Sequence, residues 1–121
     1  MIGIGTDLVE VERFRKVVAR TPTILDRVFT DDEREYAEQR RDPTERYAVR
    51  WAAKEAVMKA LGVGLGEVAM NEIEVVRAES GAPSVVLHGK AASVAGERGV
   101  TVWQVSLTHT ESAAHAIAVA L

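Results

Sequence analysis

A chain of 121 residues is expected to form one domain, spanning residues 1–121. Hydrophobic residues make up 47% of it, enough for a core, and the absence of cysteine excludes a disulfide scaffold, a thiolate zinc site and a cysteine nucleophile. The formal net charge of −3 does not point to nucleic acid. No apolar run is long enough to span a bilayer, and the start lacks the features of a signal peptide, so a cytoplasmic protein without a membrane partner is expected.

The hydrophobic pattern changes its period along the chain, and each change marks a new element. Strict alternation predicts strands, and recurrence every three to four residues predicts helices. In chain order the predicted elements are a strand at 2–9, helices at about 10–20, from Thr30 and at about 44–61, strands at 71–78 and 83–89, a short helix at 90–99, and strands at 100–109 and 112–121. The sum is an α+β fold, with an antiparallel sheet of about four to five strands packed against a long central helix and shorter helices.

The long predicted helix contains the stretch RWAAKEAVMKA, residues 50–60, in which charged side chains lie among small apolar ones. Glu55 and Lys59 are four residues apart and share a helix face with Trp51. An exposed ion pair is the simple interpretation. In the alternative the carboxylate is partly buried, and a buried carboxylate needs a cation or hydrogen-bond donors.

Asp7 raises the same question on the first predicted strand. It is a turn former or a helix cap in one interpretation. In the other, Gly3 and Gly5 keep its face of the strand free of side chains and let a ligand or another backbone approach. Two carboxylates from different elements, completed by water and phosphate oxygens, form a ligand set that Mg²⁺ accepts. Lysine and arginine side chains nearby suit the phosphate groups that such a metal bridges.

Other kinds of site are not supported by the spacing. The loop GVGLG, residues 62–66, lacks the lysine of a P-loop, and GIG at 3–5 lacks the third glycine of a dinucleotide fingerprint. The three histidines do not have zinc-ligand spacing. Ser106 and His109 lie on one strand without a G-x-S-x-G sequence, which argues against a serine hydrolase. His109, between two threonines at a strand end, remains a candidate for contacting a substrate.

Five stretches in order cover essentially the whole chain: GIGTDLVEVERF at the start, FTDDE at 29–33, RWAAKEAVMKALGVG at 50–64, GAPSVVLHGKA at 81–91 and VSLTHT at 105–110. In these stretches the chain resembles the holo-[acyl-carrier-protein] synthase family of small 4'-phosphopantetheinyl transferases. The resemblance implies a Mg²⁺-dependent enzyme of fatty acid biosynthesis. Such an enzyme moves the phosphopantetheine arm of coenzyme A onto a serine of an apo acyl carrier protein and releases adenosine 3',5'-bisphosphate.

The resemblance also assigns roles to individual residues. The metal ligands would be Asp7 and Glu55; the coenzyme A contacts would be Arg50, Lys54, Lys59, Gly62, Gly64 and His109; and the catalytic residues would be Glu55, Lys59 and His109. The base that deprotonates the serine is left open between a metal-bound water, Glu55 and His109.

The resemblance further implies a homotrimer with active sites shared between subunits. The predicted helix at 10–20 carries a local basic face, which is either a solvated surface or a docking surface for an acidic partner. The resemblance favours docking of an acidic acyl carrier protein, with Arg13 and Arg20 as the docking residues.

Two other functions fit the same residues. A Mg²⁺-dependent phosphoesterase or nucleotide hydrolase would use the same carboxylates with water as the nucleophile. A non-catalytic oligomeric binding module would keep Glu55 and Lys59 as a structural pair and would bind no coenzyme A in a magnesium-dependent way.

Overall fold

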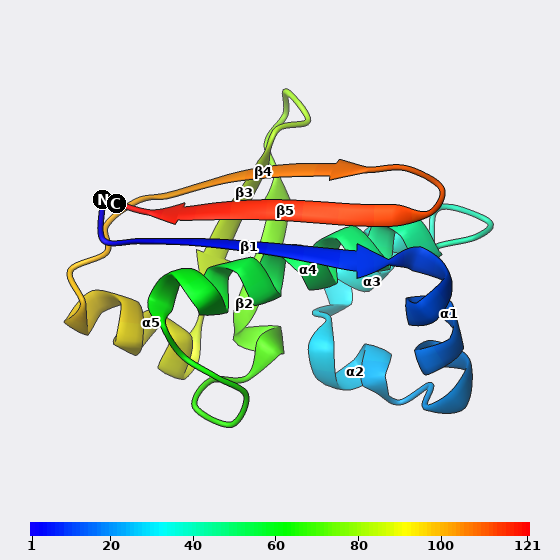
Figure 1. Ribbon diagram of the computed structural model, residues 1–121, viewed down its shortest axis with the longest axis horizontal. Helices are drawn as coiled ribbons and strands as arrows, with labels where there is room; N and C mark the ends of the chain where they lie inside the picture. The colour runs from blue at the N-terminus through cyan, green and yellow to red at the C-terminus, as the bar shows by residue number, and fades with distance from the viewer.

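The computed structural model describes all residues from 1 to 121 and has the expected α+β architecture (Figure 1). In chain order the elements are β1 (Gly3–Glu10), α1 (Val11–Arg20), α2 (Ile24–Val28), α3 (Asp31–Ala37), α4 (Thr44–Leu61), the 3-10 helix η1 (Met70–Glu72), β2 (Ile73–Arg77), β3 (Pro83–Leu87), α5 (Gly89–Glu97), β4 (Trp103–His109) and β5 (Ala113–Ala120). The predicted fold class, with antiparallel strands around one long helix, is confirmed.

The strands divide differently from the prediction of one sheet. Three of them form an antiparallel sheet in the order β1-β5-β4, and β2 and β3 form a separate antiparallel hairpin. The hairpin strand β3 lies against β4 without a hydrogen-bonded ladder between them. The short helix α2 was not predicted, because five residues are too few to show a helical hydrophobic period.

Helix α4 runs along the inner face of the three-stranded sheet, with α1 and α2 at one end of the molecule and α5 at the other (Figure 1). Glycines on β1 make this approach possible. A Cβ atom on Gly5 would lie 2.0 Å from the carbonyl oxygen of Ala56, and one on Gly3 would lie 1.9 Å from that of Ala60. The sequence left open whether a ligand or another backbone approaches these glycines, and the structure shows that the backbone of α4 does.

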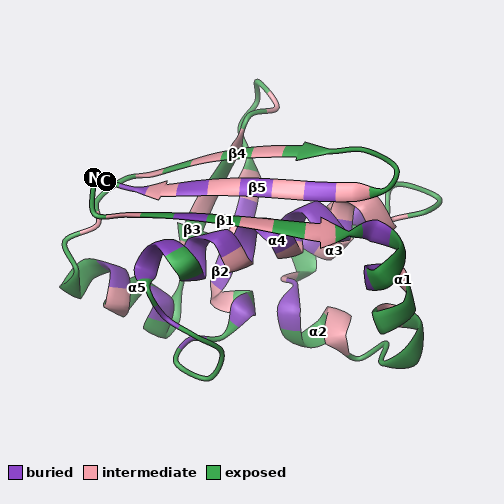
Figure 2. Ribbon diagram, in the orientation of Figure 1, coloured by how far each residue is buried: buried purple, intermediate pink, exposed green.

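The strand β5 contributes small side chains to the same contact. Four of its alanines alternate with larger residues and are fully buried against α4: Ala114, Ala116, Ala118 and Ala120 (Figure 2). The outer face of the sheet carries the larger alternate residues, and nothing in the chain covers it. On that face Ile4 and Leu8 of β1 remain exposed. A sheet with one packed face and one open, partly apolar face therefore carries the site.

No helix of the structure combines the length and the hydrophobicity that crossing a membrane requires. Helix α4 ends where predicted, because its C-cap Gly62 adopts a left-handed conformation with φ of 71°.

Candidate active site

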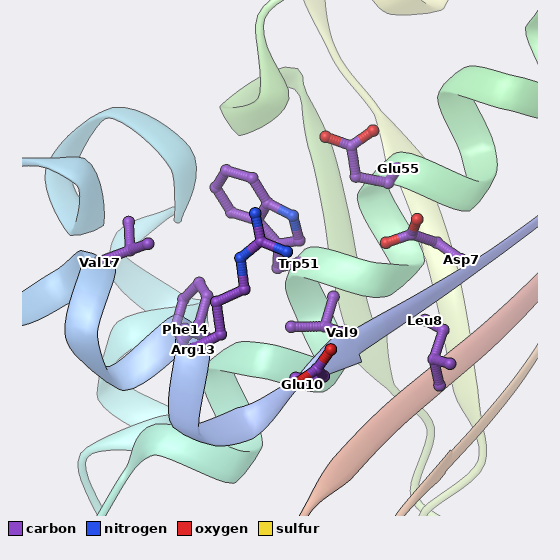
Figure 3. Close-up of a pocket in the computed structure, with 9 residues that line it drawn as sticks. All are labelled: Asp7, Leu8, Val9, Glu10, Arg13, Phe14, Val17, Trp51 and Glu55. Carbon is purple, nitrogen blue, oxygen red and sulfur yellow. The ribbon is translucent and has the colours of Figure 1, made fainter.

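A cavity of about 400 Å³ lies where the end of β1, helix α1 and the middle of α4 meet (Figure 3). It is lined by Asp7, Leu8, Val9, Glu10, Arg13, Phe14, Val17, Trp51 and Glu55. The two carboxylates predicted as metal ligands therefore line one cavity, although they are 48 residues apart in the sequence. The strand directs Asp7 inward, since it shares the inner face of β1 with the two glycines, and α4 presents Glu55 one turn after Trp51.

The pKa of Glu55 is raised above its ordinary value, first by partial burial and then by the nearby negative charge of Asp7; Lys59 opposes this shift. No hydrogen bond contributes to it. The carboxylate is thus held where its charge is unfavourable. A cation between the two carboxylates would relieve both the repulsion and the cost of burial.

Lys59 is the cation that the structure places beside them. Its ammonium donates to Asp7 Oδ1 at 3.1 Å and to the backbone oxygen of Thr6 at 2.9 Å. The lysine side chain is 54% exposed and that of Asp7 is 17% exposed. The predicted partner of Lys59 on its own helix face was Glu55, but its contact is to Asp7 on the neighbouring strand.

An aromatic pair forms the wall of the cavity opposite the carboxylates. The rings of Phe14 on α1 and Trp51 on α4 lie 5.8 Å apart between centroids. Arg13, one residue before Phe14, also lines the cavity, so a residue predicted for carrier docking stands at the rim of the candidate site (Figure 3). The hydrophobic spacing at 10–20 predicts a helix, but spacing alone does not show that Phe14 lines a cavity.

Lys54, which was predicted to contact coenzyme A, lies inside the protein. Its side chain is fully buried, and its ammonium donates to Glu33 Oε1 at 2.7 Å, to the backbone oxygen of Met70 at 3.1 Å and to that of Ile73. All three ammonium protons are used, so none remains for a ligand. Glu33 is buried as well and also accepts from the backbone nitrogens of Thr30 and Val75.

Two further predicted residues lie away from the cavity in this chain. Arg50 is buried, and its guanidinium lies over the ring of Tyr36, 4.4 Å from the ring centroid, with Nε unpaired. His109 ends β4, two strands from β1, and its Nδ1 lies 3.0 Å from Glu45 near the start of α4. A single chain therefore does not bring Arg50 or His109 to Asp7 and Glu55.

The remaining predicted residues, Arg20, Gly62 and Gly64, do not line the cavity. Arg20 ends α1 and is exposed. Gly62 caps α4, and the backbone nitrogen of Gly64 donates to Glu67. Neither glycine lines the cavity that holds the carboxylates.

The residues present fit a magnesium ion that shares its ligands with a substrate. No group of three or more histidine, cysteine or acidic side chains gathers anywhere in the structure, so a metal held by this chain alone would have two carboxylates. Mg²⁺ is commonly bound in this way, by one or two carboxylates together with water and substrate phosphates. The unfavourable position of the Glu55 charge supports the same fit.

Comparison with known proteins gives the chain a family. Residues 3–120 match the model of the 4'-phosphopantetheinyl transferase superfamily. The holo-[acyl-carrier-protein] synthase of Moorella thermoacetica is 44% identical over 118 residues, covering 98% of this chain and 92% of that protein.

Solved structures agree with the sequence match. The holo-[acyl-carrier-protein] synthase of Neisseria meningitidis superposes with a TM-score of 0.91 at 28% identity, covering 100% of this chain and 98% of that one. The Helicobacter pylori enzyme, solved in complex with coenzyme A, gives a TM-score of 0.85 at 27% identity and covers 98% and 99%. The chain therefore belongs to the 4'-phosphopantetheinyl transferase superfamily, and within it to the family of holo-[acyl-carrier-protein] synthases. The predictions of this family and of an enzyme of this kind are confirmed.

Proposed function

We propose that the protein transfers the 4'-phosphopantetheine arm of coenzyme A to a serine of an apo acyl carrier protein in a Mg²⁺-dependent reaction that releases adenosine 3',5'-bisphosphate. The observation that carries the proposal is the meeting of Asp7 and Glu55 in one cavity, with the Lys59 ammonium beside them. The names of the relatives and the coenzyme A in the Helicobacter pylori complex support it.

The reaction depends on neutralising negative charge on the phosphates more than on a covalent step by the protein. As the bond from phosphorus to the leaving phosphate breaks, negative charge grows on that phosphate. Asp7 and Glu55 would hold Mg²⁺, which neutralises charge on the pyrophosphate of coenzyme A when bound. Lys59 is long and half-exposed, so it can reach a phosphate oxygen at the mouth of the cavity and stabilise the same charge. The base for the carrier serine stays open between Glu55, His109 and a water.

The basic helix α1 suits an acidic carrier protein. Arg13 lines the cavity and Arg20 is exposed at the end of the helix, so both guanidinium groups are available. Arg15 on the same helix is different, because it pairs with Asp42 at 2.9 Å and with Glu12 at 3.2 Å. The docking residues proposed are therefore Arg13 and Arg20, with steering that weakens as salt rises.

A homotrimer with shared active sites is part of the proposal. The outer face of the sheet exposes Ile4 and Leu8, and a second copy would cover them. Arg50 and His109 lie away from the carboxylates of their own chain. A neighbouring copy would supply His109, whose side chain is exposed, to the coenzyme A site. Arg50 is buried within its own chain. We place the enzyme in the cytoplasm and in fatty acid biosynthesis.

Intact-protein mass spectrometry tests the proposal. An apo acyl carrier protein is incubated with the enzyme and coenzyme A, with Mg²⁺ or with EDTA. The expected result is a gain of one phosphopantetheine per carrier with Mg²⁺ and none with EDTA. Consumption of coenzyme A without a gain in carrier mass would indicate a hydrolase, and the absence of any turnover with several carriers would indicate a binding module.

A further inference from the structure

The contact between Lys59 and Asp7 poses a problem for metal binding. Lys59 is the one side chain that donates to the Asp7 carboxylate, and it does so from 3.1 Å. The same ammonium is tied to β1 through the backbone oxygen of Thr6. Asp7, the candidate ligand that the strand fixes in place, is therefore already paired with a cation of the protein.

A magnesium ion and this ammonium compete for the same carboxylate. The metal binds a carboxylate oxygen at about 2.0–2.1 Å and carries two positive charges. If the Lys59 ammonium stayed in contact with the same carboxylate, it would repel the metal ion over a distance of a few ångströms. The lysine can leave at little cost, because its side chain is half-exposed and flexible and its pair with Asp7 is a partly solvated one.

We infer that Lys59 exchanges one ion-pair partner for another. It pairs with Asp7 while the metal is absent, and it pairs with a phosphate of coenzyme A when the metal binds Asp7. The inference rests on the proposed function and adds a sequence of contacts to it. Before substrate binds, Lys59 opposes metal binding. Once the pyrophosphate is present, the lysine has a new acceptor, so the opposition disappears.

This exchange makes the binding of metal and coenzyme A cooperative. Metal binding to Asp7 would leave Lys59 free to pair with the phosphate. Pairing of Lys59 with the phosphate would leave Asp7 free to bind the metal. By linkage each ligand raises the affinity of the other by the same factor. Part of that factor comes from direct contact between metal and pyrophosphate, and the rest depends on Lys59.

Metal binding by Lys59→Met tests the exchange. Mn²⁺, a spectroscopic substitute for Mg²⁺ at oxygen ligands, is titrated into the protein with and without coenzyme A and followed by electron paramagnetic resonance. Without coenzyme A, Lys59→Met is expected to bind Mn²⁺ about three- to tenfold more tightly than the wild type. The gain in Mn²⁺ affinity on adding coenzyme A is expected to be smaller in the variant. Lys59→Gln serves as a second variant in case Lys59→Met fails to fold.

A charge-matched control separates the exchange from the effect of net charge. Lys90 is exposed on α5, and Lys90→Met removes the same charge away from the cavity, so its Mn²⁺ affinity should equal that of the wild type. A Lys59→Met affinity equal to the wild type or weaker would overturn the inference. If Asp7→Asn and Glu55→Gln abolish Mn²⁺ binding in that case, the proposed metal site stands without the exchange. If those two variants bind Mn²⁺ like the wild type, the metal site itself is wrong.

Discussion

Two lysines five residues apart on α4 each contact one carboxylate, and the surroundings give the two pairs different roles. Lys54 and Glu33 are fully buried, and each has backbone partners as well. Such a pair fixes the positions of the elements it joins, since removing one partner would leave a buried charge. Lys59 and Asp7 are partly exposed, and Asp7 lines the same cavity as Glu55. That pair can open, and the proposed chemistry requires it to open.

At the same scale, Glu55 is predicted to weaken the fold that holds it. Its pKa is raised in the folded chain, so the folded state binds the proton more tightly than the unfolded state does. Stability is therefore lost as pH rises from below the ordinary value of 4.5 through the raised pKa. At neutral pH, without metal, Glu55→Gln is expected to melt about 1–3 °C higher than the wild type, an effect kept small by partial exposure.

Thermal unfolding at neutral pH and near pH 4 checks this sign. The advantage of Glu55→Gln should disappear at the acid pH, where both proteins carry a neutral side chain. Mg²⁺ should not raise the melting temperature of the variant as it raises that of the wild type. A variant less stable than the wild type at neutral pH would contradict the account of Glu55.

At the scale of elements, the site depends on how closely β1 approaches α4. Gly5→Ala would place a Cβ 2.0 Å from the Ala56 carbonyl oxygen and 2.9 Å from Lys59 Cβ. The strand must move away, so we expect a loss of about 1–3 kcal/mol in the free energy of unfolding and a loss of transfer activity. Gly96→Ala is the matched control, because no atom lies within 4 Å of its Cβ position. In helix α5 it should be neutral or stabilise slightly. Chemical denaturation distinguishes the two, and equal stability of both variants would contradict the packing argument.

Helix α1 carries a second prediction at this scale. Arg13→Gln and Arg20→Gln are each expected to raise the KM for the carrier protein about three- to tenfold with little change in kcat, because they act on encounter and docking. Arg15→Gln is the matched control, since Arg15 is paired with Asp42 and Glu12. Steady-state kinetics at low and high salt measure this. A larger effect from Arg15→Gln than from the other two would contradict the docking surface.

The sequence could predict elements and pairs within an element better than pairs between elements. The boundaries of α4 and the alternation of β1 follow from local patterns, and so does the inward direction of Asp7. The role of Lys54 could not be predicted, because its partner Glu33 lies 21 residues away in the sequence. Lys54 and Glu55 are adjacent in the motif, but their side chains lie on different faces of the helix. The division of the strands into a sheet and a hairpin depends on pairing between distant segments, which no local period records.

At the scale of the whole molecule, the open face of the sheet predicts self-association. Ile4 lies on that face and is 54% exposed. Ile4→Glu is expected to shift the protein to monomers in sedimentation velocity and to reduce transfer activity, because His109 of a neighbour would be lost from the site. Leu65→Glu, a change of the same kind at an exposed loop residue, should leave the oligomer intact. An Ile4→Glu protein that sediments like the wild type would contradict the proposed interface.

The central claim, that Asp7 and Glu55 hold the metal for transfer from coenzyme A, is tested most directly by the rate of carrier modification as a function of Mg²⁺ concentration. The wild type is compared with Asp7→Asn, Glu55→Gln and the control Glu97→Gln, an exposed carboxylate on α5. The account predicts a loss of about 100-fold or more in kcat/KM for the two site variants and a normal Mg²⁺ dependence for Glu97→Gln. Transfer by Asp7→Asn or Glu55→Gln at the wild-type rate and with the wild-type Mg²⁺ dependence would contradict it.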